Sequence, residues 1–175
     1  TSQKTQINLK REQSDNKLNY LNTSFIGCGN YSRNFLIPTF KKNKFNLVNV
    51  VSKTGISGQL AKNKFSFQKN STDTDETISN FHNNIVVITT KHDTHAKYIL
   101  QAMKYKKNIF VEKPMAINSR EIDEIEKVYS NTKEYKNEEI KFVVGFNRRF
   151  SPHITKLKSL LKNNKKYKNF VYTIN

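Results

Sequence analysis

The fold of this chain is decided by a short stretch that reads Ser24-Phe25-Ile26-Gly27-Cys28-Gly29-Asn30-Tyr31-Ser32. Its first three residues are typical of a buried β-strand, and a helical pattern that continues to Phe40 begins after Gly29. Between the two, Gly27 and Gly29 allow a tight turn with a bare backbone. A strand, a glycine turn and a helix in this order place free helix N–H groups beside the turn, where they attract an anion such as a diphosphate.

The spacing Gly27-x-Gly29-x-x-Ser32 departs from the strict dinucleotide-binding fingerprint, which ends in a third glycine. A serine at the last position is still small enough for the helix and the strand to pack closely. Taken alone, the pattern is also compatible with an ordinary glycine turn. Its place after the first strand of a βα series favours a diphosphate turn, so Gly27 and Gly29 are candidate cofactor-binding residues.

The rest of the chain alternates between short apolar strands and amphipathic helices. Strands are expected at 45–51, 85–89, 108–111 and 142–145, and helices at 74–82, at 94–106 and after Asn118 and Ser151. Strands that alternate with helices predict right-handed βαβ units and a parallel sheet covered on both faces. The fold class is therefore α/β, with a Rossmann-type doubly wound parallel sheet.

Two of these helices have distinctive sequence signals. Pro38 falls inside the first helical pattern and should kink or shift that helix. The last helix starts with a capping serine followed by Pro152. Its apolar residues recur at helical spacing and predict a buried stripe made of Ile154, Leu157, Leu160 and Leu161.

The composition excludes several classes of protein. The chain has 175 residues, 35% of them hydrophobic, and a single cysteine, so it contains no intrachain disulfide. No apolar run approaches the roughly 18 residues of a membrane span, and residues 1–22 lack the apolar core of a signal peptide. We therefore expect a soluble, cytoplasmic protein that has no membrane partner. Residues 1–22 are polar and aperiodic, so we expect a linker or extension there.

The formal net charge of +17 suggests nucleic acid as a partner, but the kind of charge argues against it. Of the 31 basic residues, 26 are lysine and five are arginine, whereas base-reading sites favour the planar fork of arginine. The segment 156–168 has six lysines and no acid. We interpret it as a solvated helix face and loop, with a nucleic-acid surface as the alternative. The sequence predicts no nucleic-acid partner.

The end of the second strand bears on the choice between NAD and NADP. A site selective for NAD usually has Asp or Glu there, which binds the ribose 2′-hydroxyl. This chain has Ser52 and Lys53, a hydroxyl and an ammonium that could bind a 2′-phosphate. We therefore take both residues as cofactor-binding candidates and expect NAD(P), with a slight preference for NADP. The alternative, that Lys53 is one more surface lysine, stays open.

Polar residues also gather where three later strands end, which is where ligands bind in such folds. The three blocks read Thr89-Thr90-Lys91-His92-Asp93-Thr94-His95, Glu112-Lys113-Pro114 and Phe146-Asn147-Arg148-Arg149-Phe150. His92 and His95 have no third ligand at a recognisable spacing, so we expect no metal. A helix start and a contact with the edge of the cofactor are their preferred roles.

Lys113 is the candidate catalytic residue. It lies between a glutamate and a proline at the end of a strand, which holds its charge in place. Its ammonium could donate a hydrogen bond to a substrate hydroxyl and stabilise the alkoxide that forms as hydride leaves. The alternative is a structural pairing with Glu112.

Together, these blocks resemble the glucose–fructose oxidoreductase/inositol dehydrogenase/MocA (GFO/IDH/MocA) family. The resemblance covers about 23–175 and is carried by Gly27-x-Gly29-Asn30-Tyr31, Thr90-x-His92-Asp93-x-His95-Ala96, Glu112-Lys113-Pro114 and Gly145-Phe146-Asn147-Arg148-Arg149-Phe150-Ser151-Pro152. Within the family, the chain is most similar to the C-terminal module of bi-domain oxidoreductases, which follows a zinc-type alcohol dehydrogenase-like half. Residues 1–22 would then resemble the joint between the halves.

The resemblance implies a Rossmann domain over 23–150 and the truncated start of a C-terminal α/β substrate domain over 151–175. It implies an oxidoreductase that transfers a hydride between NAD(P) and a hydroxyl carbon of a sugar, cyclitol or related small molecule. Lys113 matches the substrate-contacting lysine of the family. The matching cofactor contacts are Gly27, Gly29, Asn30, Tyr31, Thr89, Thr90, His92, His95, Glu112 and Arg148. The family usually has Pro-Asn where this chain has Lys91-His92.

The resemblance also implies that the remaining acid/base residues, an Asp and a His, come from the C-terminal domain. We therefore expect the fragment alone to be inactive, and a homo-oligomer to form through that domain. The strand pattern at 170–174 should lack its neighbours in the sheet. The alternative function is a non-catalytic dinucleotide-binding sensor or co-regulator on the same fold.

Overall fold

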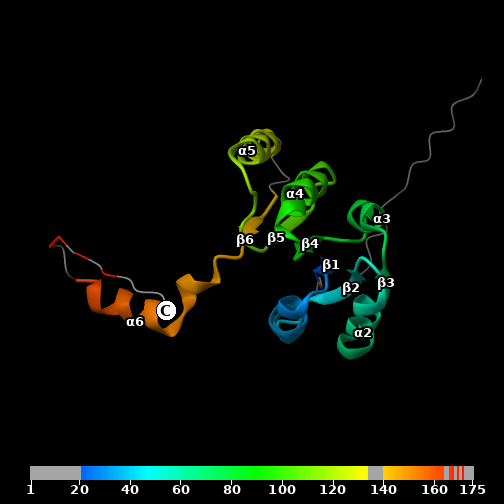
Figure 1. Ribbon diagram of the computed structural model, residues 1–175, viewed down its shortest axis with the longest axis horizontal. Helices are drawn as coiled ribbons and strands as arrows, with labels where there is room; N and C mark the ends of the chain where they lie inside the picture. Colours follow the sequence, from blue (N-terminus) through cyan, green and yellow to red (C-terminus); the bar gives the residue numbers. More distant parts are fainter. Residues whose placement is uncertain (1–20, 134–139, 164–165, 168, 170, 172–175) are drawn as a thin grey trace, which may run out of the picture.

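The apolar strand segments of the sequence pair side by side in one parallel sheet with helices on both faces (Figure 1). The computed structural model describes residues 21–133, 140–163, 166, 167, 169 and 171. In these residues the strands are β1 (Asn22–Ile26), β2 (Asn46–Val51), β3 (Lys69–Ser71), β4 (Ile85–Ile88), β5 (Asn108–Val111) and β6 (Phe142–Val144). The α-helices are α1 (Ile37–Lys42), α2 (Ile56–Phe65), α3 (Thr74–Ser79), α4 (His95–Lys104), α5 (Ser119–Lys133) and α6 (Pro152–Leu161). None of these helices is long and apolar enough to cross a membrane.

The strand order is β3-β2-β1-β4-β5-β6, and all neighbouring strands are parallel. From β1 the chain moves outward to β3, and it then returns to the other side of β1 to form β4, β5 and β6. The order therefore reverses between β1 and β4, and the loops that leave these two strands diverge. The predicted Rossmann-type doubly wound sheet is confirmed.

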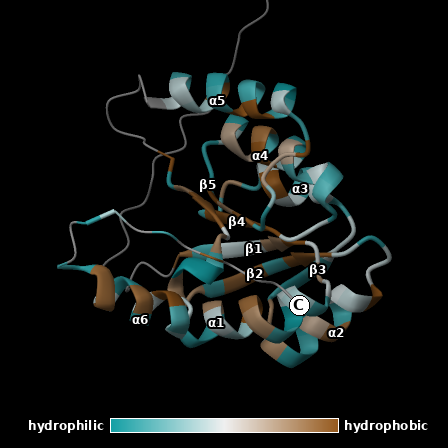
Figure 2. Cartoon of the chain, turned by 60° about the vertical axis from the view of Figure 1, so that its left-hand side comes forward, coloured by the Kyte–Doolittle hydropathy of each residue, from teal (hydrophilic) through white to brown (hydrophobic). Residues whose placement is uncertain are grey.

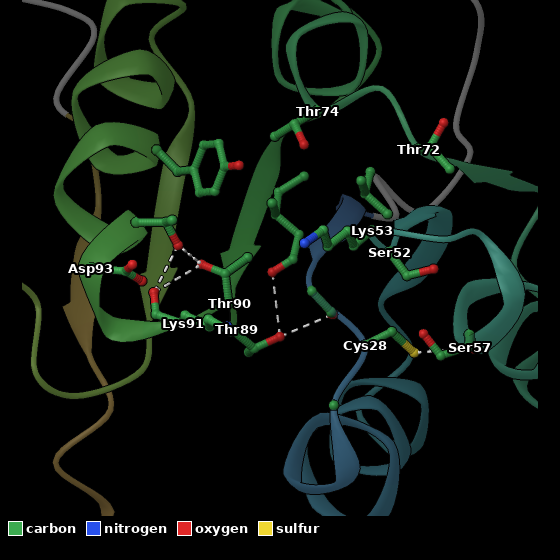
Figure 3. A pocket seen from close by; sticks show the side chains of 16 residues that line it. Cys28, Ser52, Lys53, Ser57, Thr72, Thr74, Thr89, Thr90, Lys91 and Asp93 are labelled. Atoms are coloured by element: carbon green, nitrogen blue, oxygen red, sulfur yellow. Dashed lines mark hydrogen bonds between the residues drawn. The ribbon is translucent and has the colours of Figure 1, made fainter.

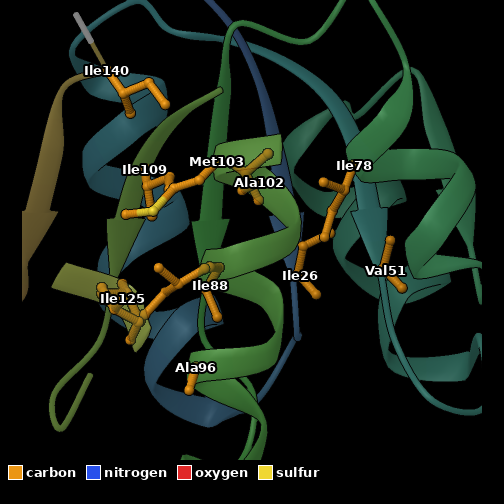
Figure 4. Close-up of a cluster of buried hydrophobic side chains, with 13 residues drawn as sticks. Ile26, Val51, Ile78, Ile88, Ala96, Ala102, Met103, Ile109, Ile125 and Ile140 are labelled. Carbon is orange, nitrogen blue, oxygen red and sulfur yellow. The ribbon is translucent and has the colours of Figure 1, made fainter. Parts of the chain in front are cut away.

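Alternating side chains on the strands build a hydrophobic core on each face of the sheet. Figure 2 shows hydrophobic residues on the strands, with helices above and below the sheet. On β1, Ile26 joins the core under α3, α4 and α5, whereas Phe25 joins the core above α1 and α2. On β4, Val86 and Ile88 belong to the first core and Val87 to the second. Figure 4 shows the first core. Burying each such side chain contributes roughly 1.5–3 kcal/mol, which fixes the register of the strands and the positions of their ends.

The helix that follows the glycine turn begins at Asn30 and continues to Lys42, but its part Ser32–Leu36 (η1) is a π-helix. Pro38 lies in the first turn of α1, directly after this π-helix. Proline has no N–H to donate to the carbonyl of Asn34, four residues before it, so the regular ladder is interrupted here. The predicted disturbance of the helix by Pro38 is confirmed.

The predicted buried stripe on the last helix is wrong. α6 begins where expected, since the Ser151 hydroxyl accepts a hydrogen bond from the Ile154 N–H at 3.3 Å. However, none of the described residues of α6 is buried, and Leu160 is 67% exposed. Burial needs a partner surface, and α6 leaves the sheet with the 3₁₀ helix Asn147–Phe150 (η3) as its main contact (Figure 1). The strand predicted at 170–174 lies outside the described residues, apart from Val171.

Candidate functional site

A cavity of about 870 Å³ lies at the carboxyl ends of β1, β2 and β4, where the strand order reverses (Figure 3). A volume of this size suits a bound small molecule or nucleotide. The predicted cofactor-binding residues that line it are Gly27, Gly29, Ser52, Lys53, Thr89 and Thr90. Other residues that line it were not predicted as cofactor contacts, among them Cys28, Ser57, Thr72, Thr74 and Tyr98. Thr72 and Thr74 follow β3, a short polar strand whose sequence shows no recognisable strand pattern.

Gly27 makes the turn out of β1. Its φ is +100°, and a Cβ at this position would lie 2.6 Å from the Thr89 carbonyl oxygen. Thr89 holds the turn in place, because its N–H donates to the Ile26 carbonyl at 2.8 Å and its hydroxyl donates to the Gly27 carbonyl at 3.0 Å. The backbone conformation and the close approach both require glycine here.

Gly27→Ala is therefore expected to destabilise the fold by about 2–4 kcal/mol, since strained backbone and steric overlap add. Urea unfolding followed by circular dichroism measures this loss. Gly29→Ala is the matched control, because a Cβ on Gly29 would meet no atom within 4 Å. Equal stability of the two variants would contradict the role assigned to Gly27.

Gly29 presents a bare backbone to the cavity, with open space where a side chain would stand. The helix begins directly after it, at Asn30, and the first N–H groups of a helix have no partner within the helix. The open space at Gly29 lies beside these free N–H groups and beside the positive end of the helix dipole. Both features favour a bound diphosphate. These residues therefore fit the cofactor that the sequence predicts.

Cys28 lies between the two glycines and also lines the cavity. Its thiol donates to the Ser57 carbonyl at 3.4 Å. Burial raises the pKa of the Cys28 thiol, and the Arg33 guanidinium lowers it by a smaller amount. The thiol is therefore neutral near pH 7, and it adds no negative charge that would repel a diphosphate.

Ser52 and Lys53 both line the cavity but have different surroundings. Ser52 is buried, and its hydroxyl accepts the Gly58 N–H at 3.0 Å, which ties the end of β2 to α2. Lys53 is exposed, and its ammonium has no hydrogen bond or ion pair with any described residue. Of the two, Lys53 is thus the one whose polar group is free to bind an anion.

The residues that follow β4 separate into two groups. Thr89 and Thr90 line the cavity, whereas the His95 ring is fully buried away from it. Nδ1 of His95 lies 2.7 Å from the Pro114 carbonyl oxygen, and Nε2 lies 3.1 Å from that of Thr90. His95 therefore links the ends of β4 and β5. The direct cofactor contact that the sequence predicts for His95 would require this ring to leave its buried position.

His92 is exposed and starts the short 3₁₀ helix His92–Thr94 (η2). It does not line the cavity, although its ring centroid is 5.7 Å from that of His95. In the part of the chain that the structure describes, no three His, Cys, Asp or Glu residues are placed to hold a metal ion. The cofactor contact of His92 stays a prediction.

Glu112 and Lys113 follow β5, outside the lining of the cavity. The Glu112 carboxylate packs against Gly145, where a Cβ would lie 2.7 Å from Oε1. Oε1 is buried without a hydrogen-bond partner among the described residues, and Oε2 accepts the Lys113 backbone N–H at 3.3 Å. The Lys113 side chain is exposed, and its ammonium pairs with no described residue, Glu112 included. The ammonium is therefore available to an external ligand.

Asn30, Tyr31 and Arg148 are exposed residues outside the lining of the cavity. Asn30 accepts a hydrogen bond from the Arg33 guanidinium at 2.7 Å, within the first turn of the helix. Arg148 lies in η3, after β6. The cofactor contacts of these three residues stay predictions.

The strand order and a glycine turn that opens onto the crevice define a dinucleotide-binding domain of the Rossmann class. A sequence profile of the GFO_IDH_MocA family, described as an oxidoreductase family with an NAD-binding Rossmann fold, matches residues 21–138. The chain belongs to this GFO/IDH/MocA family, as its motifs predicted. The special likeness to bi-domain oxidoreductases stays a prediction.

The chain is also similar to several named proteins. Oxidoreductase P35 of Formosa agariphila is 30% identical over 82% of this chain and 43% of its own length. Myo-inositol 2-dehydrogenase of Thermotoga maritima is 29% identical over 58% of this chain and 29% of its own length. The scyllo-inositol dehydrogenase of Lactobacillus casei, solved with NAD(H) and scyllo-inositol, has a TM-score of 0.72 at 22% identity, over 83% of this chain and 42% of that one. The chain thus spans less than half the length of these relatives.

Proposed function

We propose that this chain is the dinucleotide-binding half of an oxidoreductase that transfers a hydride between NAD(P) and a hydroxyl carbon of a sugar or cyclitol. The observation that carries the proposal is the turn Gly27-Cys28-Gly29, which opens onto a cavity of about 870 Å³ at the reversal of the strand order. Membership of the GFO/IDH/MocA oxidoreductase family supports it. The similarity to the myo-inositol 2-dehydrogenase of Thermotoga maritima supports a cyclitol as the substrate class.

When bound, the nicotinamide cofactor supplies the hydride acceptor or donor. The protein's part is to hold and orient it. The amides that follow Gly29 would bind the diphosphate, and the neutral Cys28 thiol leaves this region without an opposing charge. Thr89 keeps the turn in its conformation through the two hydrogen bonds to Ile26 and Gly27.

Lys113 would act on the substrate. Its ammonium, exposed and without a partner among the described residues, would donate a hydrogen bond to the substrate hydroxyl. In alcohol oxidation the hydroxyl proton would pass to a base as the hydride leaves the carbon, and the ammonium would stabilise the alkoxide character that this proton loss creates on the oxygen. In the reverse direction it would stabilise the negative charge that develops on the oxygen as hydride adds to the carbonyl carbon. The buried link from His95 to the Pro114 carbonyl keeps the end of β5 fixed while this happens.

Turnover in the full-length protein tests the function. The protein is incubated with NAD or NADP and with myo-inositol, scyllo-inositol or monosaccharides, and reduced nicotinamide is followed by its absorbance. Reduction that depends on one of these polyols is expected. Dinucleotide binding without turnover of any polyol would contradict the enzyme and favour the sensor alternative.

Lys53→Ala tests the preference for NADP. The Lys53 ammonium lines the cavity at the end of β2, so we propose that it binds the 2′-phosphate of NADP. For an exposed pair of charges, the expected loss in NADPH affinity is about 5-fold, with NADH affinity unchanged. Fluorescence titration with both reduced cofactors measures it, with Lys42→Ala as an exposed control away from the cavity. Equal losses for NADH and NADPH would refute the assignment.

A further inference from the structure

One hydrogen bond joins the two ends of the site across the sheet. The Asn147 amide donates from Nδ2 to the Tyr31 hydroxyl at 2.7 Å, although the two residues are 116 positions apart. Tyr31 belongs to the first turn of the helix after Gly29, and Asn147 starts η3 after β6. We refer to this pair as the Tyr31–Asn147 clasp.

The clasp links the ends of β1 and β6, two strands that do not pair directly with each other. β1 and β6 are separated by β4 and β5, so their ends are about 14 Å apart at the usual strand spacing. Tyr31 covers part of this distance with its long side chain, and its ring packs on Phe35 with 5.5 Å between the centroids. On the other side, the N–H groups of Phe146 and Asn147 donate to the Val144 and Gly145 carbonyls, each at 2.8 Å. A tight turn therefore holds the Asn147 side chain in position.

Both partners lie beside functional groups of the site without lining the cavity themselves. The Tyr31 backbone N–H is among the first of the helix and belongs to the set that faces an anion at the turn. At the other end, Gly145 packs against the Glu112 carboxylate, next to Lys113. The clasp thus ties the turn that would bind the diphosphate to the segment that packs beside the candidate catalytic lysine.

We infer that Asn147 is a positioning residue of the dinucleotide site: through Tyr31, it holds the first turn of the helix in the orientation that binds the diphosphate. This inference rests on the proposed function. Tyr31 is 40% exposed, so the bond adds little to the stability of the fold. Its effect is to preorganise the binding groups, which lowers the ordering cost of binding.

A double-mutant cycle on NAD(P)H affinity tests the clasp. The variants Asn147→Ala and Tyr31→Phe and their combination are titrated with whichever reduced cofactor the unaltered full-length protein binds more tightly. Each single variant is expected to bind about 2- to 3-fold more weakly, the lower end of the range for the net loss of one hydrogen bond, because the Tyr31 side chain is partly exposed. The double variant should bind no more weakly than either single variant, because the same bond is lost. The Tm of all three should stay within about 2 °C of the unaltered protein.

Tyr105→Phe and Asn34→Ala are the matched controls, since Tyr105 is 39% exposed and Asn34 is exposed on the same helix as Tyr31. Both should bind like the unaltered protein. Unchanged affinity in the clasp variants, or losses that multiply in the double variant, would overturn the clasp and leave the proposed function standing. An unaltered protein that binds neither NADH nor NADPH would overturn both.

Discussion

If the proposed function holds, replacing Lys113 by alanine is expected to lower the kcat of the full-length protein by about 10²–10³-fold, the usual effect of removing one group that stabilises a developing oxyanion. The Kd for the dinucleotide should change by less than about 3-fold, because Lys113 lies outside the lining of the cavity. Steady-state turnover and a separate cofactor titration measure the two quantities. A loss confined to kcat identifies an interaction made in the transition state.

Two further variants serve as controls for the Lys113→Ala result. Lys113→Arg keeps the charge but changes the shape of the donor, so an intermediate kcat is expected. Lys127→Ala removes an exposed lysine on α5 and should leave turnover unchanged. Turnover of Lys113→Ala equal to that of Lys127→Ala would assign Lys113 a structural role.

Gly29→Asp is expected to weaken dinucleotide binding by at least about 100-fold, since a carboxylate would stand where the negatively charged diphosphate binds. The fold should tolerate the change, because a Cβ on Gly29 meets no atom within 4 Å. Calorimetric titration gives the affinity and thermal unfolding gives the Tm. The combination of lost binding and retained Tm is specific to a residue that faces the ligand.

Gly29→Asn is the matched control, since it has nearly the same size and no charge. Gly29→Asn should bind the dinucleotide more tightly than Gly29→Asp does. The difference between their affinities measures the part of the loss that is due to the negative charge. Gly29→Asp that binds NADH and NADPH like the unaltered protein would show that the diphosphate does not bind at this turn.

Much of the fold follows from local pattern. Strands such as Ile85–Ile88 are short apolar runs, and their burial on both faces of a parallel sheet is what such runs predict. Pro38 acts through one missing N–H, so its effect is readable from sequence alone. The apolar face of α6 shows the limit. Helical spacing predicts which residues share a face, but burial depends on a partner surface, which the described chain does not place there.

A site residue could be predicted from the sequence where the backbone conformation at its position allows only one residue type. Gly27 is such a case, since its positive φ and the close Thr89 carbonyl both require glycine. Roles set by distant partners were not readable. The buried Ser52 hydroxyl binds the Gly58 N–H, and Asn147 binds Tyr31. These contacts depend on how the elements pack, and a single sequence does not state which distant residues meet.

The central claim is that the turn from Gly27 to Gly29 binds the diphosphate of NAD(P) in the cavity beside it. Isothermal titration calorimetry of the unaltered protein with NADH and NADPH tests it most directly. We predict saturable binding of one molecule per chain for at least one of the two. No heat of binding with either cofactor at millimolar concentration would contradict the claim.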